Sequence, residues 1–271
     1  MSDAMREAVS DMRSRRFERY VAIGDSSTEG LDDPDGRGGF RGWADRLAQH
    51  VADAQGTLLY ANLAVRGRRT RQVREEQLEP ALAMRPDLST VFAGTNDVVS
   101  RRFDPIAFDD DIEALYGALA RAGATVLTFT LPDLSSVIPL AGRLTPRVER
   151  LNASIRAAAA RTGAICLDLA AHPIGGDPRL WSDDRLHANA EGHTRIAAAL
   201  AAALGVPTAL GEWAAPFPSP WHPTRAERLL AHLAWGRRYL VPWLVRHAAG
   251  RSSGDGRVPK RPSLAPVHVT R

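Results

Sequence analysis

The 271-residue chain has one cysteine, Cys166, and one lysine, Lys260. A single cysteine excludes an intrachain disulfide and a thiolate-rich metal site, and it fits a reducing cytoplasm. The chain also lacks an apolar run of the roughly 20 residues that a bilayer span needs, and its charged first residues lead into no apolar signal segment. We therefore expect a cytoplasmic protein.

The excess of positive charge is confined to the C-terminal end. Residues 250–271 hold five basic groups and one aspartate, and removing them from the totals of 35 basic and 31 acidic residues leaves 30 of each. Nucleic-acid binding needs a basic face on the folded part of a protein. The neutral body therefore argues against a nucleic-acid partner.

Short apolar segments alternate with amphipathic ones along the chain. The expected strands comprise residues 20–23, 58–65, 88–93, 125–130 and 164–169. Helices are expected between them, because apolar residues there recur at spacings of three and four. Strands that alternate with helices form parallel sheets with right-handed crossovers. The predicted fold class is therefore α/β, a three-layer α/β/α sandwich on a five-stranded parallel sheet.

The same patterns divide the chain into four parts. These are an N-terminal arm (1–17), the sandwich (18–205), a C-terminal helical extension (206–249) and a Gly-, Ser- and Pro-rich basic tail that should be disordered (250–271). In the extension, residues 226–246 place leucines and tryptophans among arginines, and Pro242 should kink this helix or begin another. Such a segment can pack on the body, form a dimer face or lie on an anionic membrane. Packing on the body is the interpretation we favour, and the oligomeric state stays open.

Polar residues follow the predicted strands at their carboxyl ends, where α/β sheets bind ligands. They are Ser26, Gly67, Asn96, Asp184 and His187. A serine hydroxyl is a weak nucleophile until an imidazole takes its proton, and a carboxylate must orient that imidazole. Ser26, His187 and Asp184 supply these three groups. The backbone N–H groups of Ser26 and Gly67 and the side-chain amide of Asn96 are candidates for an oxyanion hole.

The blocks that carry these residues are Gly24-Asp25-Ser26, Asn62 to Gly67, Gly94-Thr95-Asn96-Asp97 and Asp184-Arg185-Leu186-His187. In this order they resemble the SGNH hydrolases, the GDSL family of esterases and lipases, over roughly residues 18–205. Ser27 stands where the family's name has leucine, which leaves Ser26 untouched. The resemblance implies a flavodoxin-like sandwich, ester hydrolysis through an acyl-enzyme, and no metal or organic cofactor.

Some neighbouring residues are rivals for these roles. Asp183 can replace Asp184 as the third member, although the three-residue spacing to His187 favours Asp184. His193 is a second candidate base, but a structural role in the last helix is the simpler interpretation. Three aspartates in the loop 31–40 lack the spacing of an EF-hand, so we expect no metal there.

We therefore expect a serine esterase that acts on a small-molecule, acylated sugar or lipid ester. One alternative is a non-catalytic binder of acyl or carbohydrate ligands on the same fold. Another is a membrane-peripheral lysophospholipase or thioesterase that uses residues 226–246. The loops 28–41 and 132–146 should line the site, and their composition fits each of these substrates.

Overall fold

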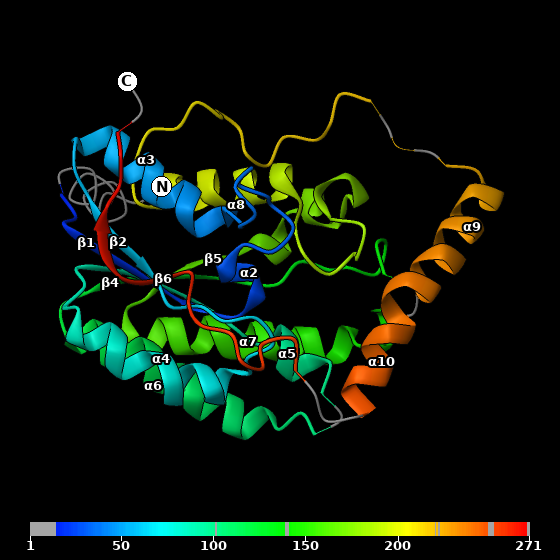
Figure 1. The fold of residues 1–271 in the computed structure, drawn as a ribbon, viewed down its shortest axis with the longest axis horizontal. Coiled ribbons are helices and arrows are strands. Elements are labelled where there is room, and N and C mark those ends of the chain that lie inside the picture. Colours follow the sequence, from blue (N-terminus) through cyan, green and yellow to red (C-terminus); the bar gives the residue numbers. More distant parts are fainter. Residues whose placement is uncertain are drawn as a thin grey trace.

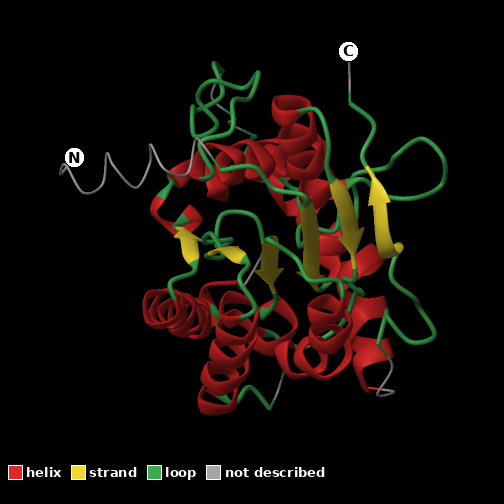
Figure 2. Ribbon diagram, turned by 90° about the vertical axis from the view of Figure 1, so that its left-hand side faces the viewer, coloured by secondary structure: helices red, strands yellow, loops and turns green. Residues whose placement is uncertain are grey.

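The computed structural model describes residues 15–100, 102–138, 141–219, 221, 223–248 and 252–269. Residues 1–14 of the predicted arm lie outside this part of the chain. Phe17, by contrast, is buried in the core. The described residues build one sheet between two layers of helices (Figures 1 and 2).

The sheet has the strand order β5-β4-β3-β1-β2-β6. Its strands are β1 (Arg19–Gly24), β2 (Leu59–Asn62), β3 (Leu88–Phe92), β4 (Thr125–Phe129), β5 (Ile165–Leu167) and β6 (Arg261–Pro266). The first five are parallel, and β6 runs antiparallel to β2. Tyr20 to Ile23, in the central β1, are fully buried because helices cover both faces of the sheet. The predicted α/β sandwich is confirmed.

Among the described residues, five helices cover the sheet. One face carries α3 (Gly42–Gln55) and α8 (Ala190–Ala203), and the other carries α4 (Thr70–Ala83), α6 (Pro105–Arg121) and α7 (Thr145–Thr162) (Figure 1). Helix α3 packs on the core through Trp43, Leu47 and Val51. Their four-residue spacing places all three apolar side chains on its buried face. Short helices follow two strands directly: α2 (Ser26–Glu29) after β1 and α5 (Thr95–Val98) after β3. Four 3₁₀ turns complete the loops: η1 (Ala141–Arg143), η2 (Leu169–Ala171), η3 (Pro173–Gly176) and η4 (Pro178–Leu180).

The C-terminal tail corrects the sequence-based prediction. Residues 250–271 were predicted to be disordered, but β6 adds a sixth strand, so the sheet is mixed rather than five-stranded and parallel. The free edge of β2 offers unpaired backbone groups to this segment. Leu264 and Val267 pack against the core, and Lys260 donates hydrogen bonds to two backbone carbonyls just before α3, at 3.0 and 2.7 Å. The composition of the tail alone does not predict that it pairs with a free edge of the sheet.

The extension contains two helices joined by a π-helical turn. These are α9 (Arg225–Trp235), η5 (Gly236–Leu240) and α10 (Val241–Ala248). They run along the side of the body where α2 and α5 lie (Figure 1). Pro242 follows the π-helical turn within a continuous helical segment, and because proline has no backbone N–H, it interrupts the helical hydrogen-bond pattern there. None of the described helices is long and apolar enough to cross a bilayer.

Candidate active site

Ser26 is the first residue of α2, immediately after β1. Asp25 caps this short helix, and its Oδ1 accepts a hydrogen bond from the backbone N–H of Ser27 at 3.0 Å. Gly24 has a φ of +153°, and a Cβ at this position would lie 2.2 Å from the carbonyl oxygen of Phe92. Only glycine fits there. The tight turn therefore places the Ser26 hydroxyl at the carboxyl edge of the sheet.

His187 and Asp184 complete a hydrogen-bonded row with Ser26. The Nε2 atom of His187 lies 2.7 Å from Ser26 Oγ, and its Nδ1 atom lies 2.6 Å from Asp184 Oδ2. Asp184 Oδ1 accepts backbone N–H bonds from Leu186 and His187 at 2.9 and 3.0 Å. The turn thus fixes its own carboxylate against the imidazole, and this carboxylate belongs to Asp184 rather than to Asp183.

A second carboxylate lies beside this row. Ser182 Oγ is 2.6 Å from both Asp184 Oδ1 and Asp32 Oδ2, and Asp32 Oδ2 is 3.9 Å from His187 Nδ1. A hydroxyl has one proton, so Ser182 can donate to only one of the two carboxylates at a time. Asp32, Asp184 and His187 are close enough together to hold a metal ion, but His187 Nδ1 and Asp184 already bond to each other. Neither Asp32 nor Ser182 was expected at this site from the sequence, because each lies in a turn-rich segment without a motif of its own.

The two partners in the row shift each other's pKa in opposite directions. Burial by itself raises the pKa of Asp184, but the hydrogen bond and charge of His187 outweigh burial and hold that pKa well below its usual range. Burial by itself lowers the pKa of His187, but the hydrogen bond and charge of Asp184, with the charges of Asp32 and Asp25, raise it above 6.5. Asp184 therefore stays ionised wherever His187 titrates.

Asn96 lies in α5, which follows β3, and Gly67 lies on the loop after β2. The Asn96 amide donates to the carbonyl oxygen of Arg68 at 3.0 Å and to Asp25 Oδ2 at 3.3 Å. Asp25 is buried, and burial raises its pKa to about 7 against the opposing hydrogen bonds from Ser27 and Asn96. Because the Asp25 carboxyl accepts hydrogen bonds from both Ser27 and Asn96, it links α5 to the turn that carries Ser26.

The C-terminal tail covers Gly67. This glycine has a φ of +75°, and a Cβ on it would lie 2.2 Å from the side-chain oxygen of Ser252. A Cβ on Gly254 would lie 2.0 Å from the carbonyl oxygen of Arg66. The tail backbone at Gly254 therefore lies against that of Arg66, where a side chain does not fit, and the left-handed φ of Gly67 favours glycine there as well.

The amino-acid sequence also matches a known protein family. Residues 22–195 match the GDSL-like lipase/acylhydrolase family. The chain belongs to this family. It is a carboxylic ester hydrolase that acts on small-molecule esters. The match ends inside α8, so α9, α10 and β6 of this GDSL-family enzyme lie beyond it.

Several solved structures share the fold. An alpha/beta hydrolase from the metagenome of Lake Arreo, Spain, is 21% identical, with 72% of this chain and 98% of that chain covered and a TM-score of 0.61. A lipase/acylhydrolase from Enterococcus faecalis is 22% identical (68% and 93% covered, TM-score 0.56). An acetyl xylan esterase from Geobacillus stearothermophilus is 16% identical (70% and 95% covered, TM-score 0.59). A comparison with curated protein sequences finds no match.

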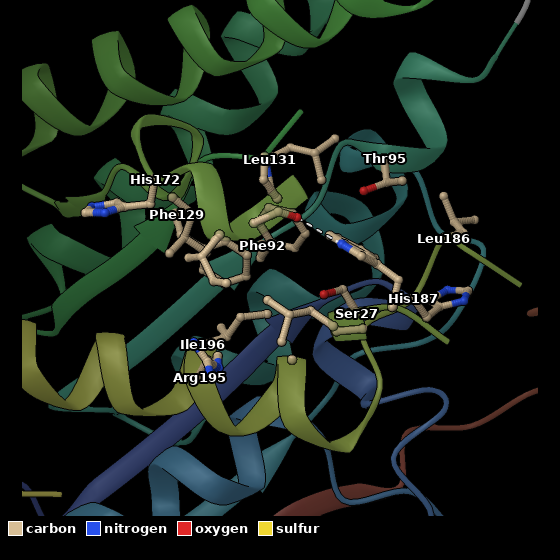
Figure 3. Close-up of a pocket in the computed structure, with 18 of the residues that line it drawn as sticks. Ser27, Phe92, Thr95, Phe129, Leu131, His172, Leu186, His187, Arg195 and Ile196 are labelled. Atoms are coloured by element: carbon tan, nitrogen blue, oxygen red, sulfur yellow. Dashed lines mark hydrogen bonds between the residues drawn. The ribbon is translucent and has the colours of Figure 1, made fainter. Parts of the chain in front are cut away.

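In this GDSL-family hydrolase, an apolar cavity of about 70 Å³ opens beside Ser26 and His187 (Figure 3). Phe92 and Phe129 stack in its wall with ring centroids 4.0 Å apart. Ile196 of α8 lies across from these rings in Figure 3. The loops 28–41 and 132–146 were expected to line the site, but among their described residues Pro132 alone borders this cavity. Strand ends, α8 and the connection before α8 form most of its wall.

His193 is a structural histidine of α8. Its Nδ1 atom accepts a hydrogen bond from the backbone N–H of Trp43 at 3.1 Å, and its Nε2 atom donates to the carbonyl oxygen of Leu31 at 3.0 Å. Burial lowers its pKa to about 4, so the ring is neutral at ordinary pH. With both ring nitrogens engaged, His193 cannot serve Ser26 as a base.

Proposed function

We propose that this enzyme hydrolyses esters of short, apolar acyl groups through a covalent intermediate on Ser26. The observation that carries the proposal is the continuous row from Ser26 Oγ to His187 Nε2 and from His187 Nδ1 to Asp184, with bonds of 2.7 and 2.6 Å. A serine so paired is an activated nucleophile.

The chemistry follows from this row. Ser26 Oγ attacks the ester carbonyl carbon, and its proton moves to His187 Nε2. As the bond from carbon to the alcohol oxygen breaks, His187 returns this proton to the leaving oxygen, and the acyl group stays on Ser26. Water then repeats the two steps and releases the acid. Asp184 stays ionised throughout and stabilises the imidazolium.

The oxyanion of each tetrahedral intermediate needs donors. We assign the backbone N–H groups of Ser26 and Gly67 and the amide of Asn96 to this role. An N–H bond to an oxyanion is charge-assisted and stronger than one to a neutral carbonyl, so a forming oxyanion competes with the carbonyl of Arg68 for Asn96. The bond to Asp25 keeps the amide close to the turn of Ser26.

The apolar cavity suits the acyl group. A cavity of roughly 150 Å³ binds benzene, which corresponds to about 25 Å³ per carbon atom. The volume of about 70 Å³ beside Ser26 then holds about three carbons beyond the carbonyl, the size of a butyryl chain.

The alcohol part of the substrate would lie on the other side of the oxyanion donors. A polar groove of about 650 Å³ borders Gly67 and Asn96 there, and Arg69 and Asp104 contribute to its lining. Polar walls match a polyhydroxy alcohol such as a sugar better than a second acyl chain. We therefore assign a polar alcohol to this groove.

Hydrolysis of p-nitrophenyl butyrate tests the proposal. Ser26→Ala should lower kcat by at least about 10⁴-fold, because it removes the nucleophile. Ser27→Ala is the matched control, since the adjacent serine also lines the cavity but makes no bond to His187, and it should keep most of the activity. A Ser26→Ala protein as active as wild type would refute the assignment.

A further inference from the structure

The helix α9 is attached to the turn that carries Asp184. The indole Nε1 of Trp235 donates to the carbonyl oxygen of Asp184 at 2.7 Å. Arg185, the next residue in the turn, donates to the carbonyl oxygen of Ala231 at 3.0 Å and to Nδ1 of His232 at 2.6 Å. The side of α9 that carries these groups therefore faces the active-site turn.

The opposite side of α9 is apolar and points into solvent. Leu229, Leu230 and Leu233 are 60%, 66% and 63% exposed. Val241 and Val245 continue the apolar surface along α10 and are 54% and 64% exposed. A surface helix normally turns such a stripe toward the core. Here the hydrogen bonds to the active-site turn hold the stripe outward.

The helical segment that carries this apolar stripe is also rich in positive charge. Residues 225–248 contain five arginines and one acidic residue, Glu227. Arg225, Arg228, Arg237 and Arg238 are all exposed, and Arg228 and Arg238 border the groove between α9 and the active-site turn. Two copies of this surface would bring like charges together in a symmetric dimer, which disfavours a second copy as the occupant. An anionic lipid surface complements both features, because the stripe can enter the acyl boundary while arginines bind phosphates.

A tryptophan next to α9 is a further residue type that is common at membrane interfaces. Trp221 precedes α9 at the border of the same groove and is 49% exposed. Indole rings gather at membrane interfaces, where one end of the ring is apolar and the other is hydrated. A short, basic helix pair with an exposed apolar side is typical of segments that lie in the plane of an interface.

We propose that α9 and α10 dock the enzyme on an anionic lipid surface. The helices lie in the headgroup region with Leu229, Leu230 and Leu233 directed into the acyl boundary. Because Trp235 and Arg185 tie α9 to the active-site turn, docking keeps the Ser26 site next to the membrane surface. This inference concerns where the enzyme works and does not depend on the acyl preference.

Co-sedimentation of the full-length protein with two kinds of vesicle tests this. Wild type should bind mixed phosphatidylcholine–phosphatidylglycerol vesicles and bind phosphatidylcholine alone much more weakly. Leu229→Ser/Leu233→Ser should weaken binding to the mixed vesicles at least about 30-fold, since two leucines that would enter the acyl boundary are lost. Arg237→Gln/Arg238→Gln should also cost about 30-fold there and little on phosphatidylcholine.

Matched control variants distinguish vesicle binding by this surface from nonspecific vesicle binding. Ile106→Ser removes an apolar side chain of α6 that is 71% exposed, and Arg85→Gln/Arg121→Gln removes two exposed arginines at the opposite edge of the sheet. Both controls should bind like wild type, and all variants should hydrolyse soluble p-nitrophenyl butyrate normally.

Two results would overturn the proposal. One is wild-type protein that stays in the supernatant with the mixed vesicles, or that sediments equally well after the leucine changes. The other is a wild-type dimer that the Leu229→Ser/Leu233→Ser change dissociates, without vesicle binding. Light scattering would show that dimer, and the stripe would then be an interface between two copies.

Discussion

Replacing Ile196 with alanine should lengthen the acyl chain that the enzyme prefers. The change removes three carbons from the wall of the cavity, which adds roughly 75 Å³ at about 25 Å³ per carbon. The cavity of about 70 Å³ would then double in volume. The optimum should move from butyrate in wild type toward hexanoate and octanoate.

The size of the effect follows from methylene transfer. Each methylene that fits contributes about 0.8 kcal/mol, or about fourfold in kcat/KM. Wild type should therefore prefer butyrate to acetate by about 15-fold and lose activity beyond butyrate, where the wall blocks the chain. In Ile196→Ala, hexanoate should exceed butyrate by about 15-fold.

A series of p-nitrophenyl esters from acetate to palmitate measures this. Ile165→Ala is the matched control, because Ile165 also packs against the core but does not line the cavity. Its profile should follow wild type. A wild-type optimum at acetate or palmitate, or an unchanged optimum in Ile196→Ala, would refute the assignment of the cavity to the acyl group.

Three further predictions follow from the site and the tail. The kcat/KM should rise with pH to a plateau with a midpoint above 6.5, because only neutral His187 can take the proton of Ser26; a midpoint below 6.5 would contradict the raised pKa. Ser182→Ala should lower kcat about tenfold at unchanged KM, since Asp184 loses a hydrogen bond from a hydroxyl group. An unchanged kcat would show that Ser182 does not support Asp184 in catalysis. Lys260→Met should lower the free energy of unfolding in urea by about 2 kcal/mol, because it removes charge-assisted hydrogen bonds to two carbonyls and the ion pair with Asp45. Unchanged stability would mean that the tail is not docked.

The parallel part of the fold was predictable because its signals are local. Apolar runs such as Val21 to Ile23 indicate buried strands, and the spacing of Trp43 and Leu47 indicates a helix face. Parallel strands end at one edge, so residues that follow them converge there. Ser26 and His187 are 161 residues apart in the chain and lie within hydrogen-bond distance.

Other features depend on tertiary contacts that leave no local pattern. The pairing of β6 needs the free edge of β2, and Pro262 and Pro266 within it weaken any strand signal. Asp32 and Ser182, 150 residues apart, meet only after the loops fold. The leucines of α9 stay exposed because Arg185 and its neighbours contact the other side of the helix, so α9 contacts the body through hydrogen bonds rather than through its apolar side.

Covalent labelling of the active serine tests the central claim most directly. The native protein would be treated with a fluorophosphonate, digested, and mapped by mass spectrometry. We predict one adduct per chain, on Ser26, formed at a rate that falls sharply in His187→Ala. A folded protein that takes up no label, or carries it on another residue, would contradict the account.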